Sequence, residues 1–314
     1  MDFIQRGFTG KTNSWMYILT MFLIFLAIQF ASIPLVIAAY FEVDGDMQEF
    51  LKGAEANFMD IGMNSNLFLF LMIFTFMIGV FTLLLCVKYI HKKKIISIVT
   101  SRSKIDWKRV FYAFSLWGSI SVIALFIGIY ITPEIYTWNF KPIPFFTLLF
   151  VSFVFLPFQT SAEELIFRGY LMQGFGTLVK NRWFPLILTS VIFGLLHGMN
   201  PEVEKLGYVL MVFYIGTGLF YGITTLMDEG TELALGLHAS NNIIAAFLVT
   251  TDWMVFRTDA LYVDTSEPSV GAEMYVSVFV LYPILLLIFS KKYGWTNWRG
   301  KLFGKVKRPV IDEK

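Results

Sequence analysis

The sequence predicts an all-α, polytopic membrane protein with about eight transmembrane helices and both termini in the cytoplasm. Of its 314 residues, 56% are hydrophobic and only 15% are charged, which leaves too little polar surface for a soluble domain of this size. The apolar residues are gathered in long runs, and the basic residues lie mostly between these runs. Together these observations favour a single membrane domain over residues 1–314.

Eight apolar runs are each compatible with a helix that crosses a hydrocarbon core of about 30 Å. They lie at Trp15–Tyr40, Leu67–Lys88, Phe111–Ile131, Phe145–Phe167, Phe184–Met199, Leu206–Leu226, Glu232–Val249 and Met274–Phe289. The fifth and eighth runs are short. The first run is long and lacks a small-residue cleavage site, so we expect a retained helix and not a signal peptide.

The distribution of Lys and Arg predicts the orientation, because short cytoplasmic loops are enriched in these residues. The basic segments are 88–109, 180–182 and 291–308, and the acidic ones are 42–66 and 250–273. Alternation across eight spans places every basic segment, and both termini, on the cytoplasmic side. The loop Met227–Thr231 does not follow this pattern, since it contains Asp228 and Glu229 but no base.

Several classes of function are excluded by composition. The net charge is only +2, and no stretch combines clustered Lys and Arg with aromatic residues, so we expect no nucleic-acid partner. The single cysteine, Cys86, excludes a disulfide framework and a cysteine-based zinc site. Membrane lipid is the expected environment. Of the three histidines, His91 lies in a basic loop and is predicted to be solvated surface.

Ionisable residues inside predicted spans are costly, and they therefore mark candidate sites. In the fourth run, Glu164 and Arg168 are four residues apart, so on a helix they share a face and can pair. Glu163 then lies on another face without an evident cation, and an unpaired carboxylate is suited to act as a general base. The alternative is an interfacial salt bridge at a helix end, since this segment lies near the cytoplasmic boundary.

Two further segments place histidines in apolar helices. His197 follows Phe193 by four residues in the fifth run, where Gly194 and Gly198 are also explained by close helix packing. In the seventh run, His238 and Asn242 are four apart and face the same way. Their donors can hold a developing oxyanion, although interhelical hydrogen bonding explains the same residues without chemistry.

The three segments Glu163-Glu164-x-x-x-Arg168, Phe193-x-x-x-His197 and His238-x-x-x-Asn242 resemble the CPBP family. This family comprises intramembrane endopeptidases that include CAAX proteases and bacteriocin-processing enzymes, and it is also called the ABI family. The resemblance covers a protease core at about residues 145–249. It implies a multi-pass protein, here of a bacterial inner membrane, with a cavity open to the cytoplasm and a membrane-associated or lipidated protein or peptide as substrate.

The resemblance also implies a role for each motif residue. Glu163 and His197 would activate a water molecule, and His238 and Asn242 would stabilise the oxyanion. Supporting roles would then fall to Glu164, Arg168 and Phe193. The signatures of other intramembrane protease classes, such as H-E-x-x-H, G-x-S-x-G and G-x-G-D, are absent from the sequence.

Three alternatives stay open at this stage. Glu163, His197 and His238 form a sufficient ligand set for catalytic zinc, although we favour a mechanism without a cofactor. A non-proteolytic membrane scaffold or bacteriocin-immunity protein would use the same polar cluster to bind a partner. A transporter would use the buried charges as an ion path, but the paired interrupted helices typical of transporters are not apparent.

The predicted depths of the motif residues conflict. A rise of about 1.5 Å per residue puts His197 far above the cytoplasmic level expected for Glu163 and His238. The motifs meet only if the fifth helix begins below the membrane plane, tilts, or follows a cytoplasmic elbow, for which Gly169–Arg182 is the candidate.

Overall fold

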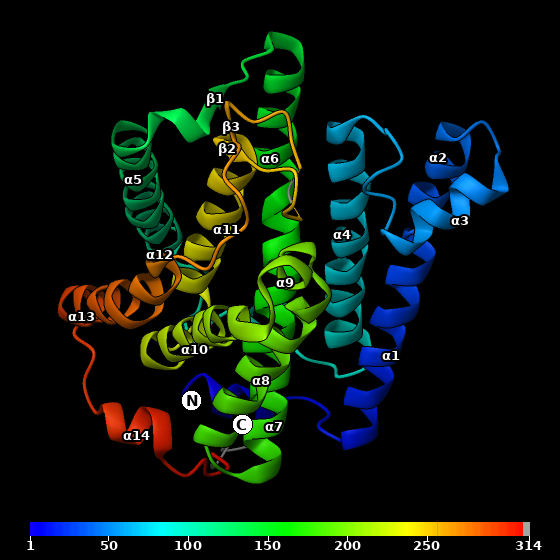
Figure 1. Cartoon of the computed structure of the whole chain (residues 1–314). Helices are drawn as coiled ribbons and strands as arrows, with labels where there is room; N and C mark the ends of the chain where they lie inside the picture. Colours follow the sequence, from blue (N-terminus) through cyan, green and yellow to red (C-terminus); the bar gives the residue numbers. More distant parts are fainter. Residues whose placement is uncertain (256, 310–314) are drawn as a thin grey trace.

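The computed structural model describes residues 1–255 and 257–309, which form a helical bundle with a small sheet at one end (Figure 1). The helices are α1 (Ser14–Ala31), α2 (Ile33–Glu42), α3 (Met47–Glu55), α4 (Ser65–Tyr89), α5 (Trp107–Ile131), α6 (Pro142–Glu164), α7 (Met172–Val179), α8 (Trp183–Leu196), α9 (Pro201–Leu206), α10 (Met211–Asp228), α11 (Glu232–Phe247), α12 (Ala272–Val276), α13 (Tyr282–Tyr293) and α14 (Trp298–Phe303). Two π-helices, Leu165–Leu171 and Ser277–Leu281, continue α6 into α7 and α12 into α13. The strands β1 (Tyr136–Trp138), β2 (Val249–Thr250) and β3 (Tyr262–Asp264) pair in the order β1-β3-β2, antiparallel and then parallel.

Local sequence accounts for where the long helices begin. The Asn64 side chain accepts hydrogen bonds from backbone amides in the first turn of α4, and Asp106 does the same for α5. Such caps satisfy amides that have no partner within the helix. Pro142 starts α6, where a missing N–H costs nothing. Between these ends, an apolar chain in lipid must satisfy its backbone internally, which favours helix.

The all-α membrane architecture predicted from the sequence is confirmed. Each of the eight predicted runs coincides largely with helix, and within the described residues six helical segments are long and apolar enough to span a membrane. Two are shorter: the segment Trp183–Met199 and the 16-residue α11. The count of eight crossings therefore stays a prediction.

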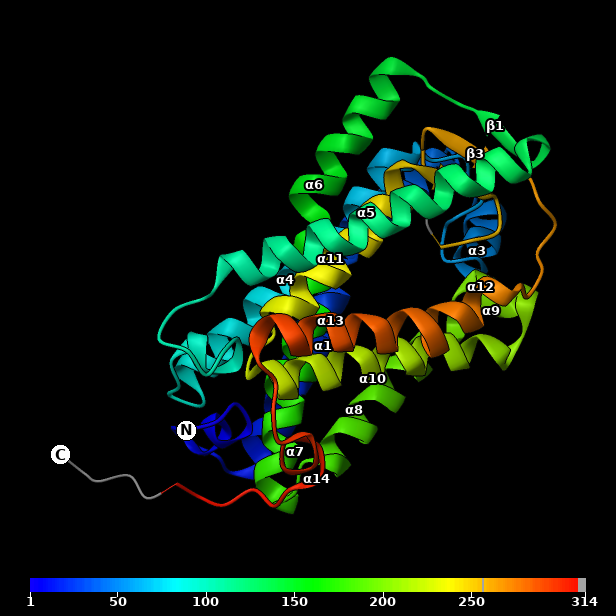
Figure 2. The same cartoon turned by 90° about the vertical axis from the view of Figure 1, so that its left-hand side faces the viewer.

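The two ends of the bundle differ in composition. The N-terminal residues and α14 lie at one end, and α3 and the sheet lie at the other (Figures 1 and 2). The acidic loop that did not fit the charge pattern is at the N-terminal end, where Asp228 pairs with Arg102 and Arg109, and Glu229 pairs with Lys301. These bases come from the segments predicted to be cytoplasmic. The negative charges of this loop are thus paired with basic residues of neighbouring segments, although the loop itself contains no Lys or Arg.

The prediction that His91 is solvated surface is wrong. His91 is 0% exposed; its Nδ1 donates to the Lys11 carbonyl at 2.8 Å, and its Nε2 lies 2.7 Å from the Tyr170 hydroxyl. The neighbouring Lys93 is also buried and donates to the Gly7 carbonyl. Burial lowers the pKa of Lys93 to about 8. The cause is the N-terminal segment, which folds over this loop and removes it from water.

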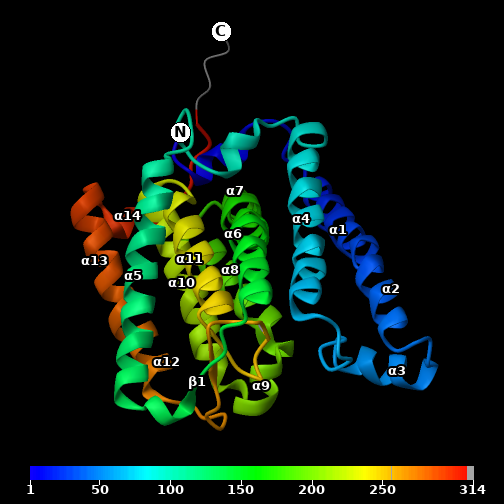
Figure 3. The same cartoon turned by 90° about the horizontal axis from the view of Figure 1, so that it is seen from above.

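Four helical segments occupy the centre of the bundle. Seen from above, α6, α8, α10 and α11 lie between α1 and α4 on one side and α5 and α13 on the other (Figure 3). α11 packs against both α5 and α6, and α8 packs against α10. A Cβ on Gly236 would lie 2.1 Å from the Val110 carbonyl oxygen, so this glycine allows α11 to approach α5 closely. Every motif residue lies on these four central segments or in their connections.

Candidate active site

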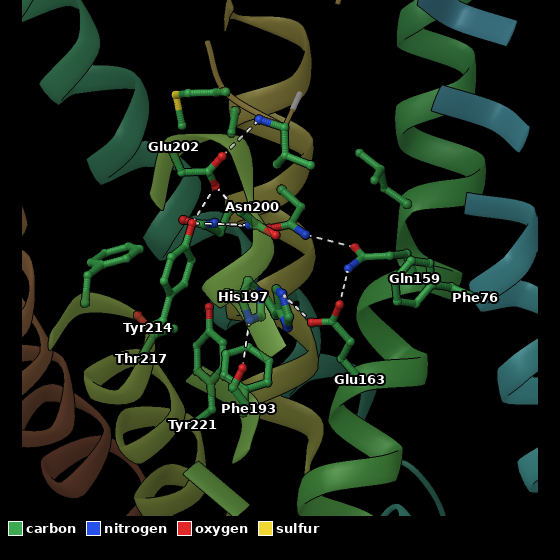
Figure 4. Close-up of a pocket in the computed structure, with 18 of the residues that line it drawn as sticks. Phe76, Gln159, Glu163, Phe193, His197, Asn200, Glu202, Tyr214, Thr217 and Tyr221 are labelled. Atoms are coloured by element: carbon green, nitrogen blue, oxygen red, sulfur yellow. Dashed lines mark hydrogen bonds and ion pairs between the residues drawn. The ribbon is translucent and has the colours of Figure 1, made fainter. Parts of the chain in front are cut away.

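The three sequence motifs meet at one cavity of about 230 Å³. Its lining includes Glu163 from α6, Phe193 from the end of α8, His197 directly after α8, and His238 and Asn242 from α11 (Figure 4). The same-face placement of His238 and Asn242 is thus confirmed. Glu164 and Arg168 lie outside the lining and are both 0% exposed.

A long helical hairpin resolves the conflict in depth. The helix that carries Glu163 continues through the π-helix and α7 as far as Val179. The chain reverses at Lys180, which has a left-handed φ of 58°, and α8 returns over a similar length. The fifth predicted helix therefore begins well below Glu163, and His197 at its end reaches the cavity. The predicted elbow at Gly169–Arg182 is mostly helix, and only its last residues turn.

The two glycines beside His197 have different surroundings. A Cβ on Gly194 would lie 2.4 Å from the Ile215 side chain, so this glycine does serve close packing of α8 on α10. A Cβ on Gly198 would meet no atom of the described residues within 4 Å. Helix packing therefore explains only one member of the predicted small-residue pair.

The Glu163 carboxylate has one bonded and one free oxygen. Gln159, one turn earlier on α6, donates from Nε2 to Oε1 of Glu163 at 2.6 Å. Oε2 is buried and has no hydrogen-bond partner in the described part of the chain. Nε2 of His238, which can carry a positive charge when the ring is protonated, lies 3.6 Å from Oε2. This distance is too long for a hydrogen bond. One oxygen is therefore fixed, and the other remains available to accept a proton.

A chain of hydrogen bonds connects Glu163 to α11 and α5. The Trp117 Nε1 donates to Oδ1 of Asn241 (3.2 Å), and Nδ2 of Asn241 donates to Oδ1 of Asn242 (3.1 Å). Nδ2 of Asn242 then donates to Oε1 of Gln159 (2.9 Å), which in turn donates to Glu163. Every bond runs in the same direction. The chain fixes Asn242 and Glu163 relative to each other through Gln159, which sequence reasoning missed.

The predicted pair of Glu164 and Arg168 is present and fully buried. Nη1 of Arg168 lies 2.9 Å from Oε1 of Glu164, and the guanidinium carbon lies 4.2 Å from the centre of the Phe193 ring. This contact is a cation–π interaction that stabilises a charge removed from water. Phe193 therefore contacts the buried ion pair and also lines the cavity, which Glu164 and Arg168 do not line.

The same carboxylate orients His238. Nδ1 of His238 donates to Oε1 of Glu164 at 2.8 Å, which leaves Nε2 directed towards Glu163. The imidazole also stacks on Tyr221, with ring centres 5.2 Å apart. Because Nδ1 already donates, His238 can donate from Nε2 only as the doubly protonated imidazolium.

His197 is oriented by its own helix. Its Nδ1 lies 2.8 Å from the Phe193 carbonyl oxygen, which can only accept, so Nδ1 carries the proton. In the neutral ring, Nε2 is then the acceptor. The imidazole stacks on Tyr214 at 4.5 Å between centres and 26° between planes. The geometry thus leaves a lone pair of His197 available for chemistry.

The opposite wall of the cavity carries residues that sequence reasoning also missed. Glu202, 4% exposed, accepts hydrogen bonds from the Tyr214 hydroxyl (2.5 Å), the Asn200 amide (3.0 Å) and the Val255 backbone (3.1 Å). Glu202 lies between two predicted membrane spans, in a segment where charged residues are expected to be exposed, so the sequence did not indicate that its side chain is buried. For Gln159 a sign existed, since it is a polar residue within an apolar run and one turn from Glu163.

The candidate zinc ligands Glu163, His197 and His238 do not form a metal-binding group in this arrangement. Over the described residues, no three His, Cys, Asp or Glu side chains are grouped closely enough to hold a metal ion. We therefore derive no step of the chemistry through a metal.

Comparison with known proteins assigns the family. The profile of the Rce1-like family, described as type II CAAX prenyl endopeptidase, matches residues 142–244 and so spans all three motifs. A Bacillus subtilis (strain 168) protein, "Uncharacterized protein YyaK", is 30% identical over 211 residues, which are 66% of this chain and 71% of that protein. No solved structure gives a significant match. The chain is therefore a multi-pass membrane protein that belongs to the Rce1-like CAAX-protease family, the CPBP family that its motifs resemble.

Proposed function

We propose that the protein is an intramembrane endopeptidase that hydrolyses a peptide bond with water activated by Glu163 and His197. The observation that carries this proposal is the meeting of Glu163, His197, His238 and Asn242 at one cavity from separate helices. Among the described residues, Oε2 of Glu163 has no hydrogen-bond partner, and the bond from Nδ1 of His197 leaves Nε2 as the acceptor atom of that ring. A water molecule bound between such acceptors would be polarised for attack.

The reaction would proceed by general base and general acid catalysis. The water oxygen attacks the carbonyl carbon of the scissile bond as its proton passes to Glu163 or His197. The negative charge on the carbonyl oxygen is stabilised by the remaining Nδ2–H of Asn242 and by Nε2–H of protonated His238. The stored proton then moves to the peptide nitrogen, the C–N bond breaks, and an amine and a carboxylate are released.

The supporting residues would hold this arrangement before the substrate binds. Glu164 orients His238, and Arg168 compensates the charge of Glu164. Because the groups are fixed by hydrogen bonds, little reorganisation is needed in the transition state. The substrate class that fits is a membrane-associated or lipidated protein or peptide, entering from the cytoplasm or the bilayer, and the location proposed is a bacterial inner membrane.

Replacing Gln159 with methionine is expected to reduce kcat by about 10- to 100-fold with little change in KM. Methionine has a similar length but no amide, so Glu163 loses the hydrogen bond from Gln159 and its fixed orientation, and small misplacements of catalytic groups cost this much. Steady-state kinetics with a cleaved peptide measure both constants. Thr160→Val is the matched control, because the adjacent hydroxyl bonds only to carbonyls of its own helix. A Gln159→Met protein with unchanged kcat would contradict the role of the hydrogen-bond chain.

Chelation should leave the activity of the purified protein unchanged. In this proposal the water is activated by a carboxylate and an imidazole, so treatment with EDTA or 1,10-phenanthroline removes nothing that the reaction uses. Cleavage is measured before and after treatment, and after addition of zinc. Loss of activity with a chelator and recovery with zinc would replace this mechanism with a metal-dependent one.

The proposed function is tested by substrate trapping. The Glu163→Ala protein is expected to retain a bound substrate that the wild-type protein cleaves, and mass spectrometry of peptides that co-purify from membranes identifies it. Incubation with wild-type protein should then cut the captured peptide at a defined bond. If captured partners are bound equally by both proteins and cut by neither, the protein is a scaffold and not a protease.

A further inference from the structure

A second carboxylate faces the same cavity from the wall opposite Glu163. Figure 4 shows Glu202 and Tyr214 on one side of the pocket, and Gln159 and Glu163 on the other. Nothing in the proposed hydrolysis uses Glu202. Its burial therefore needs another explanation, because removing a carboxylate from water is costly unless something compensates its charge.

The partners of Glu202 are all neutral. They are the Tyr214 hydroxyl, the Asn200 amide and the Val255 backbone amide. Of the described residues that line the cavity, none is Lys or Arg. The guanidinium of Arg168, which lies behind Phe193, is already paired with Glu164. Among the described residues that line the cavity, carboxylates thus outnumber Lys and Arg side chains. The electrostatic potential in the cavity therefore favours a positively charged ligand.

Aromatic rings also line the cavity. Phe213 and Tyr214 are among them, with ring centres 5.7 Å apart in an edge-to-face arrangement, and the Tyr214 hydroxyl bonds to Glu202. A carboxylate in a cavity lined by aromatic rings is a favourable environment for an ammonium or guanidinium group, since both attract positive charge. A metal ion is a poorer ligand, because three donors already direct their hydrogens at Glu202, and the described residues contain no group of three His, Cys, Asp or Glu side chains that could hold a metal ion.

We propose that Glu202 forms an anionic subsite that binds a Lys or Arg side chain of the peptide substrate. The inference rests on the proposed protease activity and specifies its substrate class: peptides with a basic residue at one fixed position relative to the scissile bond. A peptide whose C-terminal carboxylate must enter the cavity is disfavoured, because the described lining residues include no Lys or Arg to pair with it.

The test begins with a randomised peptide library digested by the wild-type protein in detergent micelles. Cleavage sites identified by mass spectrometry should be enriched in Lys and Arg at a single position. A peptide with lysine at that position is then compared with its acetyl-lysine counterpart, which keeps the length of the side chain but removes the charge. We expect kcat/KM of the wild-type protein to fall by about tenfold on acetylation.

The variant Glu202→Gln supplies the second measurement. The ratio of kcat/KM for lysine over acetyl-lysine peptide should fall by about tenfold relative to wild type, while Glu204→Gln, an exposed position on the same short helix, should leave the ratio unchanged. Equal loss for both peptides would mean that Glu202 only holds Tyr214 in place, and it would overturn the subsite. Cleavage that depends on Glu163 but shows no basic preference would also overturn it. No Glu163-dependent cleavage of any peptide would instead refute the proposed function.

Discussion

Glu163→Gln should lower kcat by about 100- to 10,000-fold, the range expected for removal of a general base. Glutamine keeps the shape of the side chain, and its oxygen can still accept from Nε2 of Gln159. What it lacks is the second acceptor oxygen at the position of the unbonded Oε2. The loss should therefore appear in kcat with little change in KM.

The kinetics of this variant need a control for general effects of charge removal. Glu134→Gln removes an exposed carboxylate that is not part of the cavity lining and should behave as wild type. Thermal unfolding of Glu163→Gln should match wild type within experimental error, because no buried partner is left unpaired. A Glu163→Gln protein that cleaves at the wild-type rate would remove Glu163 from the reaction.

Arg168→Met should destabilise the protein by about 3–5 kcal/mol, the typical cost of breaking a buried ion pair by removing one partner. Glu164 is 0% exposed, and its second oxygen already has no hydrogen-bond partner among the described residues. Without the guanidinium, its negative charge would have only the His238 ring for compensation. Reversible unfolding in mixed detergent micelles measures the change in free energy.

A double variant separates the cost of the unpaired charge from the loss of packing. Glu164→Gln combined with Arg168→Met removes both charges of the pair, so much of the lost stability should return. Arg257→Met breaks a solvent-exposed pair with Asp60 and should cost only about 0–1 kcal/mol. If Arg168→Met is no more costly than Arg257→Met, or if the double variant is no more stable than Arg168→Met alone, the pair does not carry the stability assigned to it.

Interactions between residues one helical turn apart could be predicted from the sequence. The Glu164–Arg168 pair and the shared face of His238 and Asn242 follow from a spacing of four on a helix. The same rule applies to the uncharged Gln159, which lies one helical turn before Glu163 on α6. Hydropathy likewise predicted the all-α membrane fold. Whether a run forms a membrane-spanning helix depends on the composition of that run and not on how the runs pack.

Features that depend on contacts between distant segments could not be predicted. The depth of His197 follows from the helical hairpin that extends past Glu163 to Val179, and no local signal gives the length of that extension. The burial of His91 is caused by the N-terminal segment that contains Lys11. Glu202 is drawn into the cavity wall by Tyr214 and Val255 from later parts of the chain. In each case a tertiary contact overrides what the surrounding sequence favours.

The most direct test of the central claim is cleavage of the trapped peptide in heavy-oxygen water with a chelator present. Purified wild-type protein is predicted to release two fragments, with one heavy oxygen atom in the new carboxylate, while Glu163→Gln protein releases none in the same time. This result would identify metal-independent peptide hydrolysis at the cavity that Glu163 lines. An intact peptide after incubation with wild-type protein, or equal cleavage by both proteins, would contradict the account.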